Sequence, residues 1–437
     1  MSFASSNGRA HGSREDREDR EHREREEDAS SAASSVAQSG EGESSGRPFY
    51  ILSVDGGGIR GMLTIFFLRH LEHSLASLAR TNDKLLVHDL FDMFAGTSAG
   101  GMLATAVGLR RQSMSELSAV FNCDTMCSIF DKSFIDRLCG NVQFRPKYDG
   151  DAKTAALKRA IGERTRFCRN ATGKFVLVPT YDLEAWESVF FVNHDFPTLS
   201  ATTTDREDRQ ARGDRRARED NWSGDAPLDH SAPLAYKVAD ATSAAPTYFP
   251  AVHLETYVGR VERAMPDEPS LRYVDSWFVD GGVNKNNPAL TAALAARRHL
   301  RNHGQQTRPI RVLSLGTGQS KHFRKGGGTD DASDAEDFGG IQWMRNNLLQ
   351  MLMDETHTHQ EMQLFFDEPE RDYVRVNGDL GEAGVAPDLD DTSSDNVDAI
   401  RRLSCKWWRE HAERVYALLD LPFDASVCSE PIAWDQL

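Results

Sequence analysis

Short apolar runs alternate with amphipathic stretches along the middle of the chain. Apolar runs typical of buried β-strands lie at residues 49–54, 92–95, 175–182, 188–194, 277–280, 310–315 and 373–377. After the first of these runs, Leu63, Phe67, Leu71, Leu75 and Leu78 recur at intervals of three and four residues. This spacing predicts a helix with one buried face.

The other amphipathic stretches predict further helices between and after the strands. Small residues dominate 99–109, and Asn287-Pro288 is a typical helix start, with an N-cap followed by proline at the first position. Stretches 341–355 and 405–420 carry helical periodicity late in the chain. Because strands and helices alternate, we expect an α/β domain over residues 49–423, with a mostly parallel central sheet covered by helices on both faces.

Three segments lack the apolar residues that a packed core needs, and a fourth is a predicted tail at the end of the sequence. Residues 1–48 contain the run REDREDREHREREED and are predicted to be a disordered, charged tail. Residues 204–232 and 324–338 are predicted to be surface insertions, and 424–437 a C-terminal tail. In residues 204–220 acids and arginines are equal in number, so this insertion does not have the net positive charge of a polybasic membrane tether.

Charge and hydropathy narrow the possible partners. The 437 residues carry a formal net charge of −16, which argues against nucleic acid as a partner. No run reaches the ~18 apolar residues of a transmembrane anchor, and the N-terminus has no apolar region of a signal peptide. We therefore expect a soluble or peripheral intracellular protein. Cys123 and Cys127 have no second pair at zinc-site spacing, so no metal and no cofactor are expected.

The stretch SVDGGGIRGM follows the first predicted strand and has two possible functions. Gly56, Gly58 and Gly61 match the G-x-G-x-x-G spacing of a dinucleotide-binding turn. That fold needs an acidic residue at the end of the next strand, about 20 residues on, to bind the ribose. Here a helix occupies that distance, and Asp83 follows it in a segment that does not end a strand. A dinucleotide site is therefore the weaker alternative.

The next predicted strand leads instead to a serine. Gly96-Thr97-Ser98-Ala99-Gly100 is a G-x-S-x-G sequence between a short strand and a helix, the context of a nucleophile elbow. A sharp turn there exposes the Ser98 hydroxyl, and glycines at 96 and 100 let strand and helix approach closely. The glycines of the first turn then have a second use: amides at Gly56, Gly57 and Gly58, with the charge of Arg60, would form an oxyanion hole.

A serine nucleophile needs a base, and Asp280 is the best candidate. It ends an apolar strand and is followed by two glycines, which allow another backbone to come close. Alternatively, Asp280 only caps the turn that follows. Six downstream histidines have no motif around them and are expected to be ordinary surface residues: His299, His303, His322, His357, His359 and His411.

Together these motifs resemble the patatin-like phospholipase family. The glycine motif at 55–61, the elbow G-T-S-x-G-G at 96–101 and the D-G-G motif at 280–282 occur in family order. The stretches VLVPTYDLE, ATSAAPTYFP and VLSLGTG are also similar. The resemblance spans about residues 49–318. Asp240 is a departure, because the family commonly has arginine before ATSAAP.

The resemblance implies a three-layer α/β/α fold and a lipid acyl hydrolase. It implies a Ser98 nucleophile, Asp280 as proton acceptor, an acyl-enzyme, and neither a catalytic histidine nor a metal. The substrate would be a lipid or a membrane surface. The alternative is a catalytically weak lipid-binding or scaffold protein on the same fold.

One amphipathic stretch after the elbow helix also bears on the substrate. Met126, Phe130, Phe134 and Leu138 recur at helical spacing. Core packing would explain them. Our hypothesis is that part of this stretch lines the acyl channel or touches lipid.

Overall fold

A computed structural model describes residues 46–78, 85–131, 145–168, 172–193, 232–257, 261–263, 273–319 and 356–428. Its strands form one sheet. Their bounds are β1 (Phe49–Val54), β2 (Met93–Gly96), β3 (Phe175–Asp182), β4 (Glu187–Val192), β5 (Val252–Tyr257), β6 (Val261–Arg263), β7 (Tyr273–Asp280), β8 (Ile310–Leu315) and β9 (Tyr373–Val376). The order across the sheet is β5-β7-β3-β2-β1-β8-β9, and β4 and β6 extend from β3.

The sheet combines a parallel centre with an antiparallel wing. Strands β3, β2, β1, β8 and β9 run parallel to one another. Strands β7, β5, β4 and β6 pair antiparallel. The sequence patterns predicted the parallel centre, whereas β5 and β6 were not predicted.

The helices of two or more turns have these bounds: α2 (Met62–Leu78), α4 (Ala99–Leu109), α5 (Met114–Val120), α6 (Cys123–Ile129), α8 (Asp151–Ile161), α10 (Ala235–Thr242), α11 (Ala289–Asn302), α14 (Thr356–Phe365) and α16 (Ser394–Leu418). Shorter helical turns are η1 (Gly58–Gly61), α3 (Val87–Leu90), η2 (Gly281–Val283), α15 (Pro369–Asp372), η4 (Leu380–Glu382) and α17 (Ala425–Cys428).

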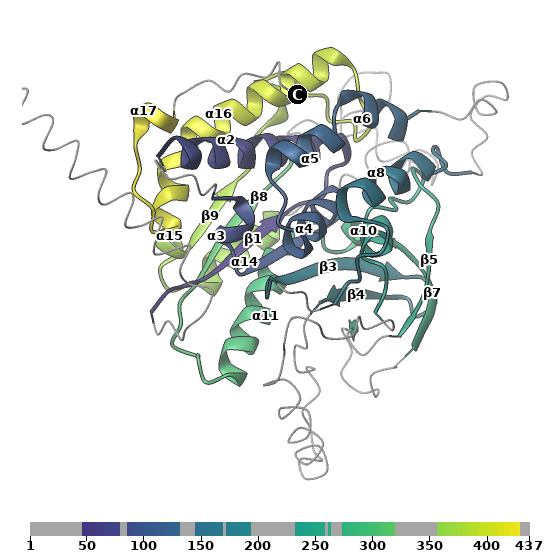
Figure 1. Ribbon diagram of the computed structural model, residues 1–437, viewed down its shortest axis with the longest axis horizontal. Helices are drawn as coiled ribbons and strands as arrows, with labels where there is room; N and C mark the ends of the chain where they lie inside the picture. The colour runs from purple at the N-terminus through teal and green to yellow at the C-terminus, as the bar shows by residue number, and fades with distance from the viewer. Residues whose placement is uncertain are drawn as a thin grey trace, which may run out of the picture.

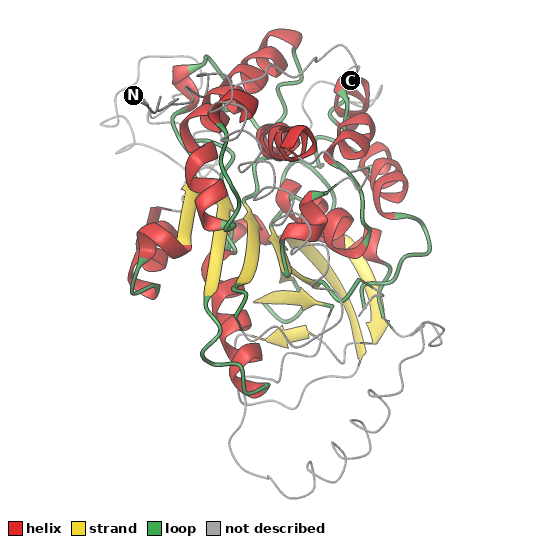
Figure 2. Ribbon diagram, turned by 60° about the vertical axis from the view of Figure 1, so that its left-hand side comes forward, coloured by secondary structure: helices red, strands yellow, loops and turns green. Residues whose placement is uncertain are grey.

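Alternation along β1 shows why helices cover both faces of the sheet. Tyr50, Leu52 and Val54 belong to a large core with α2, α4, α8, α10 and α16. Phe49 and Ile51 point the other way, into a smaller core with α11 and α14. In Figure 1, α2, α5 and α16 lie above the strands and α11 lies below them. Figure 2 shows the same sheet between helices from another side. The predicted three-layer α/β/α class is confirmed.

Several predicted segments differ in extent or lie outside the described residues. Helix α16 begins 11 residues before the predicted start at 405. The helix predicted at 341–355, residues 1–45 of the N-terminal tail, 204–231 of one insertion and all of 324–338 lie outside the described residues. After Phe423, the described residues include α17, which packs on the domain because the Trp408 indole N–H donates to the carbonyl of Cys428 (2.9 Å).

The sheet topology brings three predicted motifs to one place. Strands β1 and β2 are parallel neighbours, so the glycine turn after Val54 and the serine turn after Gly96 lie at the same edge. Strand β7 runs antiparallel to β3, with Asp280 opposite Thr180. The end of β7 therefore meets this edge from the other direction.

Candidate functional site

A strained turn holds Ser98 at the start of α4. Its φ of 54° and ψ of −124° lie in a region that residues with side chains rarely adopt. The turn is also very tight. A Cβ at Gly96 would lie 2.0 Å from the Gly100 carbonyl oxygen, and one at Gly100 would lie 2.3 Å from the Val54 carbonyl oxygen. Only glycine at 96 and 100 lets the elbow helix approach β1 and β2 this closely.

Thr242 fixes the backbone of Ser98 from a distant helix. Its hydroxyl accepts the Ser98 amide hydrogen at 3.1 Å and donates to the Pro179 carbonyl at 2.6 Å. The hydroxyl therefore both accepts and donates a hydrogen bond, and both of its partners are buried. The strained turn is thus held from α10 as well as from its own strand and helix.

Asp280 lies beside Ser98 at the end of β7. The two side chains line the same pocket, and the Ser98 hydroxyl favours the ionised form of Asp280 and so lowers the pKa of its carboxyl group. The Gly282 amide donates to Oδ1 at 2.7 Å, and the Asp280 amide donates to the Ala244 carbonyl at 3.0 Å. Gly281 must be glycine, because a Cβ there would lie 2.3 Å from the Pro179 carbonyl oxygen. The Gly282 amide therefore orients the carboxylate, and the Ala244 carbonyl holds the backbone of Asp280 beside Ser98.

Burial gives this carboxylate an unusual proton affinity. Asp280 is 4 % exposed, and burial raises the pKa of its carboxyl group from 3.8 to about 6. The hydrogen bonds from Ser98 and Gly282 and the positive charge of Lys153 oppose this rise. The carboxylate remains ionised near neutral pH, yet it is a stronger base than an exposed aspartate.

The glycine turn after β1 lies against three other segments. The Gly56 carbonyl accepts the Thr317 hydroxyl at 2.6 Å, and its amide donates to the Asn286 carbonyl at 3.2 Å. Gly58 has a φ of 56°, and a Cβ there would lie 2.2 Å from the Leu389 carbonyl oxygen. Within the described part of the chain, the amides of Gly57 and Gly58 have no acceptor.

Two arginines brace this turn from behind. Arg375 forms a bidentate ion pair with the buried Asp55: Nη1 lies 2.9 Å from Oδ1 and Nη2 lies 2.5 Å from Oδ2. Arg60 is buried as well, and its guanidinium donates to the Gly57 carbonyl at 3.4 Å and the Gly318 carbonyl at 3.5 Å. Burial lowers the pKa of Arg60 to about 10. Of the four predicted oxyanion-hole residues, Gly58 lines the pocket described next, whereas Gly56, Gly57 and Arg60 do not.

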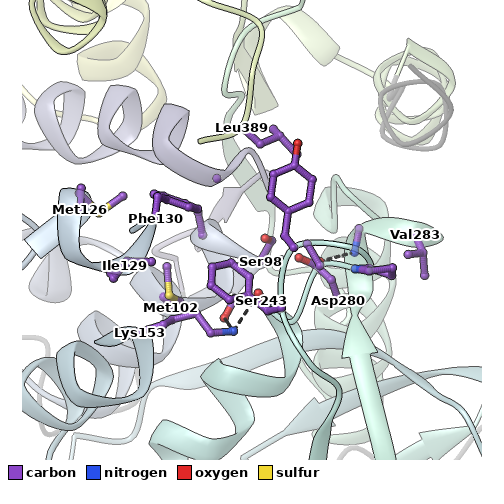
Figure 3. A pocket seen from close by; sticks show the side chains of 17 residues that line it. Ser98, Met102, Met126, Ile129, Phe130, Lys153, Ser243, Asp280, Val283 and Leu389 are labelled. Atoms are coloured by element: carbon purple, nitrogen blue, oxygen red, sulfur yellow. Dashed lines mark hydrogen bonds between the residues drawn. The ribbon is translucent and has the colours of Figure 1, made fainter. Parts of the chain in front are cut away.

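A mostly apolar pocket opens onto Ser98 and Asp280. Apolar side chains from α4, α6 and three loops form its walls: Met102, Met126, Ile129, Phe130, Pro246, Tyr248, Phe249, Val283 and Leu389. Figure 3 shows Met126, Ile129 and Phe130 on one side of Ser98, with Asp280 on the other. Met126 and Phe130, from the amphipathic stretch, thus face the pocket. Phe134 and Leu138 lie outside the described residues.

One charged side chain in the pocket was not predicted. Lys153, on α8, lines the apolar wall below Ser98 and is fully buried. Its ammonium group lies 3.0 Å from the carboxylate of Asp240, the residue at which the sequence departs from the family. Lys153 has no motif around it in the sequence, so nothing there indicated that it would reach the pocket.

The described histidines downstream of Ser98 that were candidate bases do not line the pocket. His299 packs against Phe49 and Phe175, and His359 bonds to the Tyr373 hydroxyl at 3.2 Å. None of the five described histidines of this set lines the pocket, and His322 lies outside the described residues. Across the described ranges there is no group of three or more His, Cys, Asp or Glu side chains arranged for a metal. No helix among the described residues is long and apolar enough to span a membrane.

Known proteins show the same family resemblance. The family model described as patatin-like phospholipase matches residues 52–293. Patatin-like protein 2 of Oryza sativa subsp. indica is 26 % identical over 400 residues, covering 84 % of this chain and 86 % of its own length. Patatin group D-2 of Solanum tuberosum is 25 % identical, covering 80 % and 81 %. Human GIVD cytosolic phospholipase A2 is 11 % identical with a TM-score of 0.36, covering 94 % and 67 %.

Proposed function

The chain belongs to the patatin-like phospholipase family, and we propose that it is a serine lipid acyl hydrolase with Ser98 as nucleophile and Asp280 as base. The observation that carries this proposal is that Ser98, in its strained turn, and the buried Asp280 carboxylate lie side by side in an apolar pocket. A nucleophile needs a proton acceptor within hydrogen-bond reach, and Asp280 is that acceptor.

The first half of the reaction acylates Ser98. Its Oγ attacks the ester carbonyl carbon as the hydroxyl proton passes to Asp280, so one C–O bond forms and the carbonyl oxygen becomes an oxyanion. When the tetrahedral species collapses, the ester C–O bond breaks and Asp280 returns the proton to the departing alcohol or lysolipid. The acyl group is left on Ser98.

The second half releases the fatty acid. Asp280 takes a proton from a water molecule as that water attacks the acyl carbon. On collapse the bond to Ser98 Oγ breaks, and the proton returns from Asp280 to Oγ. The enzyme regains its starting protonation state, so a single carboxylate serves both halves.

Backbone amides supply the stabilisation of the oxyanion. Gly58 lines the pocket, its amide and that of Gly57 have no acceptor within the described ranges, and Ala99 begins the helix behind the nucleophile. The first amides of a helix lack an internal partner and favour negative charge. Arg60 contributes indirectly, because its guanidinium holds the Gly57 carbonyl and so fixes the turn.

The pocket walls define the substrate class. Apart from Lys153 and the catalytic pair, its lining is dominated by apolar side chains, which match a hydrocarbon chain and offer no site for a second charged group. A fatty acyl chain would lie along Met126, Phe130 and Phe249, with its ester carbon at Ser98. A lipid at a membrane surface is therefore the substrate that we propose.

Matched variants test this proposal with a short soluble ester and with phospholipid vesicles. Ser98→Ala and Asp280→Asn should each lower kcat by on the order of 10³-fold or more, and the double variant should be little worse than either, because the two residues act as one unit. His299→Ala and His359→Ala are controls that should keep most activity. A folded histidine variant as inactive as Ser98→Ala, or an active Asp280→Asn, would contradict the proposal.

A further inference from the structure

A buried ammonium group lies in the wall of the otherwise apolar pocket. Lys153 Nζ donates to the carbonyls of Asp240 (3.1 Å) and Ser243 (2.9 Å) and lies 3.2 Å from the Ser243 hydroxyl. It also lies 3.0 Å from the Asp240 carboxylate and 4.4 Å from the centre of the Phe249 ring. Burying an unpaired charge destabilises a protein by several kcal/mol, and even a paired charge is often no more favourable than an apolar side chain. A lysine at this position therefore suggests a functional role for its charge.

The hydrogen-bond and ion-pair partners of Lys153 lie at the end of α10. This helix ends at Thr242, and its last carbonyl groups receive no hydrogen bond from amides within the helix. A cation at this end satisfies those carbonyls and the helix dipole together. Asp240 is held in turn from α8, because the Thr154 hydroxyl donates to its other carboxylate oxygen at 2.7 Å. Lys153 and Thr154 thus tie α8 to the segment from Asp240 to Ala244.

The same segment also contacts both members of the proposed catalytic pair. The Thr242 hydroxyl accepts the Ser98 amide hydrogen, and the Ala244 carbonyl accepts the Asp280 amide hydrogen at 3.0 Å. Lys153 binds Asp240, two residues before Thr242, and Ser243, which lies between Thr242 and Ala244. Figure 3 shows Lys153 bonded to Ser243 below Ser98.

We propose that Lys153 is a positioning residue of the hydrolase site, which holds the Asp240–Ala244 segment against Ser98 and Asp280 and places a positive charge near the base. This inference rests on the proposed function of Ser98 and Asp280. Lys153 is not itself a base in this account, because its ammonium group is occupied by Asp240 and Ser243. Burial lowers the pKa of Lys153, whereas the Asp240 carboxylate opposes this fall, favours the charged form and holds the ammonium group in place.

The charge of Lys153 has a consequence that a purely structural tie would not have. Three groups favour the ionised form of Asp280: the Ser98 hydroxyl from α4, the Gly282 amide from η2, and the Lys153 charge from α8. Strand β3 presents the neutral Thr180 opposite Asp280, and α10 presents Asp240, which is paired with Lys153. Removing the lysine charge should therefore raise the pKa of Asp280. The acid limb of the pH–activity profile, where kcat/KM falls as Asp280 becomes protonated, should then move to higher pH.

The test measures kcat/KM against pH for a short soluble ester with the full chain. Lys153→Met keeps length and removes the charge, and we expect the acid limb to move up by about half to one pH unit, since a nearby opposite charge shifts a carboxyl pKa by about this much or more. KM for the small ester should change little, because Lys153 acts on the base and not on binding. Lys158→Met is the matched control: Lys158 lies on the same helix and also contacts α10, over the Tyr236 ring. Its acid limb should stay in place.

A second variant guards against misfolding. In Lys153→Met the Asp240 carboxylate loses its cationic partner, so Lys153→Met/Asp240→Asn removes both charges and should move the acid limb in the same direction, by no more than Lys153→Met does. An unchanged acid limb in a folded variant, or an equal shift in Lys158→Met, would overturn the proposal. Failure of both Lys153 variants to fold would also overturn it, because the pair would then belong to the core alone.

The same experiment separates this inference from the proposed function. If Asp280→Asn stays fully active, the proposed base is wrong whatever Lys153 does. If Lys153→Met loses activity at every pH while Asp280→Asn keeps it, Lys153 would be the base and both ideas fail. If Ser98→Ala and Asp280→Asn are inactive and only the shift is missing, the function stands and the role of Lys153 falls.

Discussion

Asp280→Asn should make the protein less active and more stable at neutral pH. The native carboxyl group has a pKa of about 6, against an ordinary value of 3.8, because it is buried. Its ionised form is therefore disfavoured in the folded protein relative to the unfolded chain. The asparagine amide keeps the size of the side chain, can accept from Gly282 and can donate to Ser98, and carries no charge to bury.

The size of the gain follows from the shift in pKa. A shift from 3.8 to about 6 corresponds to about 3 kcal/mol of stability that wild type lacks above pH 6. Because the pKa of Asp280 is raised in the folded protein, its protonated form stabilises the fold. This contribution to the free energy of unfolding is fully present below pH 3.8 and is lost as pH rises through 6. Between pH 8 and pH 5, the advantage of Asp280→Asn over wild type should therefore fall to about half.

Urea unfolding at pH 8 and pH 5 measures both quantities. Asp275→Asn is the matched control, because Asp275 lies on the same strand with an exposed side chain, and its stability should stay close to that of wild type. The reasoning is refuted if Asp280→Asn is no more stable than wild type at pH 8, or if its advantage does not shrink at pH 5. Either result would mean that burial does not destabilise the ionised Asp280 carboxylate in the native state.

Three further outcomes follow from the contacts of the site. Arg375→Met should lower the free energy of unfolding by about 3–5 kcal/mol in urea, because it leaves the Asp55 carboxylate buried without its ion pair; an unchanged midpoint would contradict this. Phe130→Asp should reduce activity on phospholipid vesicles more than on a short soluble ester, since Phe130 lines the pocket, and equal losses would indicate only a packing role. The proposed dyad needs no metal, so EDTA should leave ester hydrolysis unchanged; inactivation that calcium reverses would count against it.

The local motifs were predictable because their geometry is set by neighbouring residues. A serine elbow needs glycines two positions away on each side, and Gly96 and Gly100 have no room for a Cβ. The parallel centre of the sheet followed from alternating strands and helices. The end of β7 at Asp280 was visible as an apolar run followed by two glycines.

The contacts that assemble the site were not predictable, because they join distant parts of the chain. Thr242 lies 144 residues from Ser98, and Thr317 lies 261 residues from Gly56. A threonine at the end of a short helix carries no sign of its partner. Lys153 is likewise ordinary in sequence, and only the packing of α8 on α10 shows that it reaches the pocket.

The central claim, that Ser98 carries the acyl group between the two halves of the reaction, has a direct measurement. The purified protein is mixed with a slowly turned-over fatty acyl ester, quenched in acid, digested and analysed by mass spectrometry. We predict an added acyl mass on the peptide that contains Ser98 in wild type, and no such mass in Ser98→Ala. An acyl group on another residue, or hydrolysis that persists in Ser98→Ala, would contradict the account.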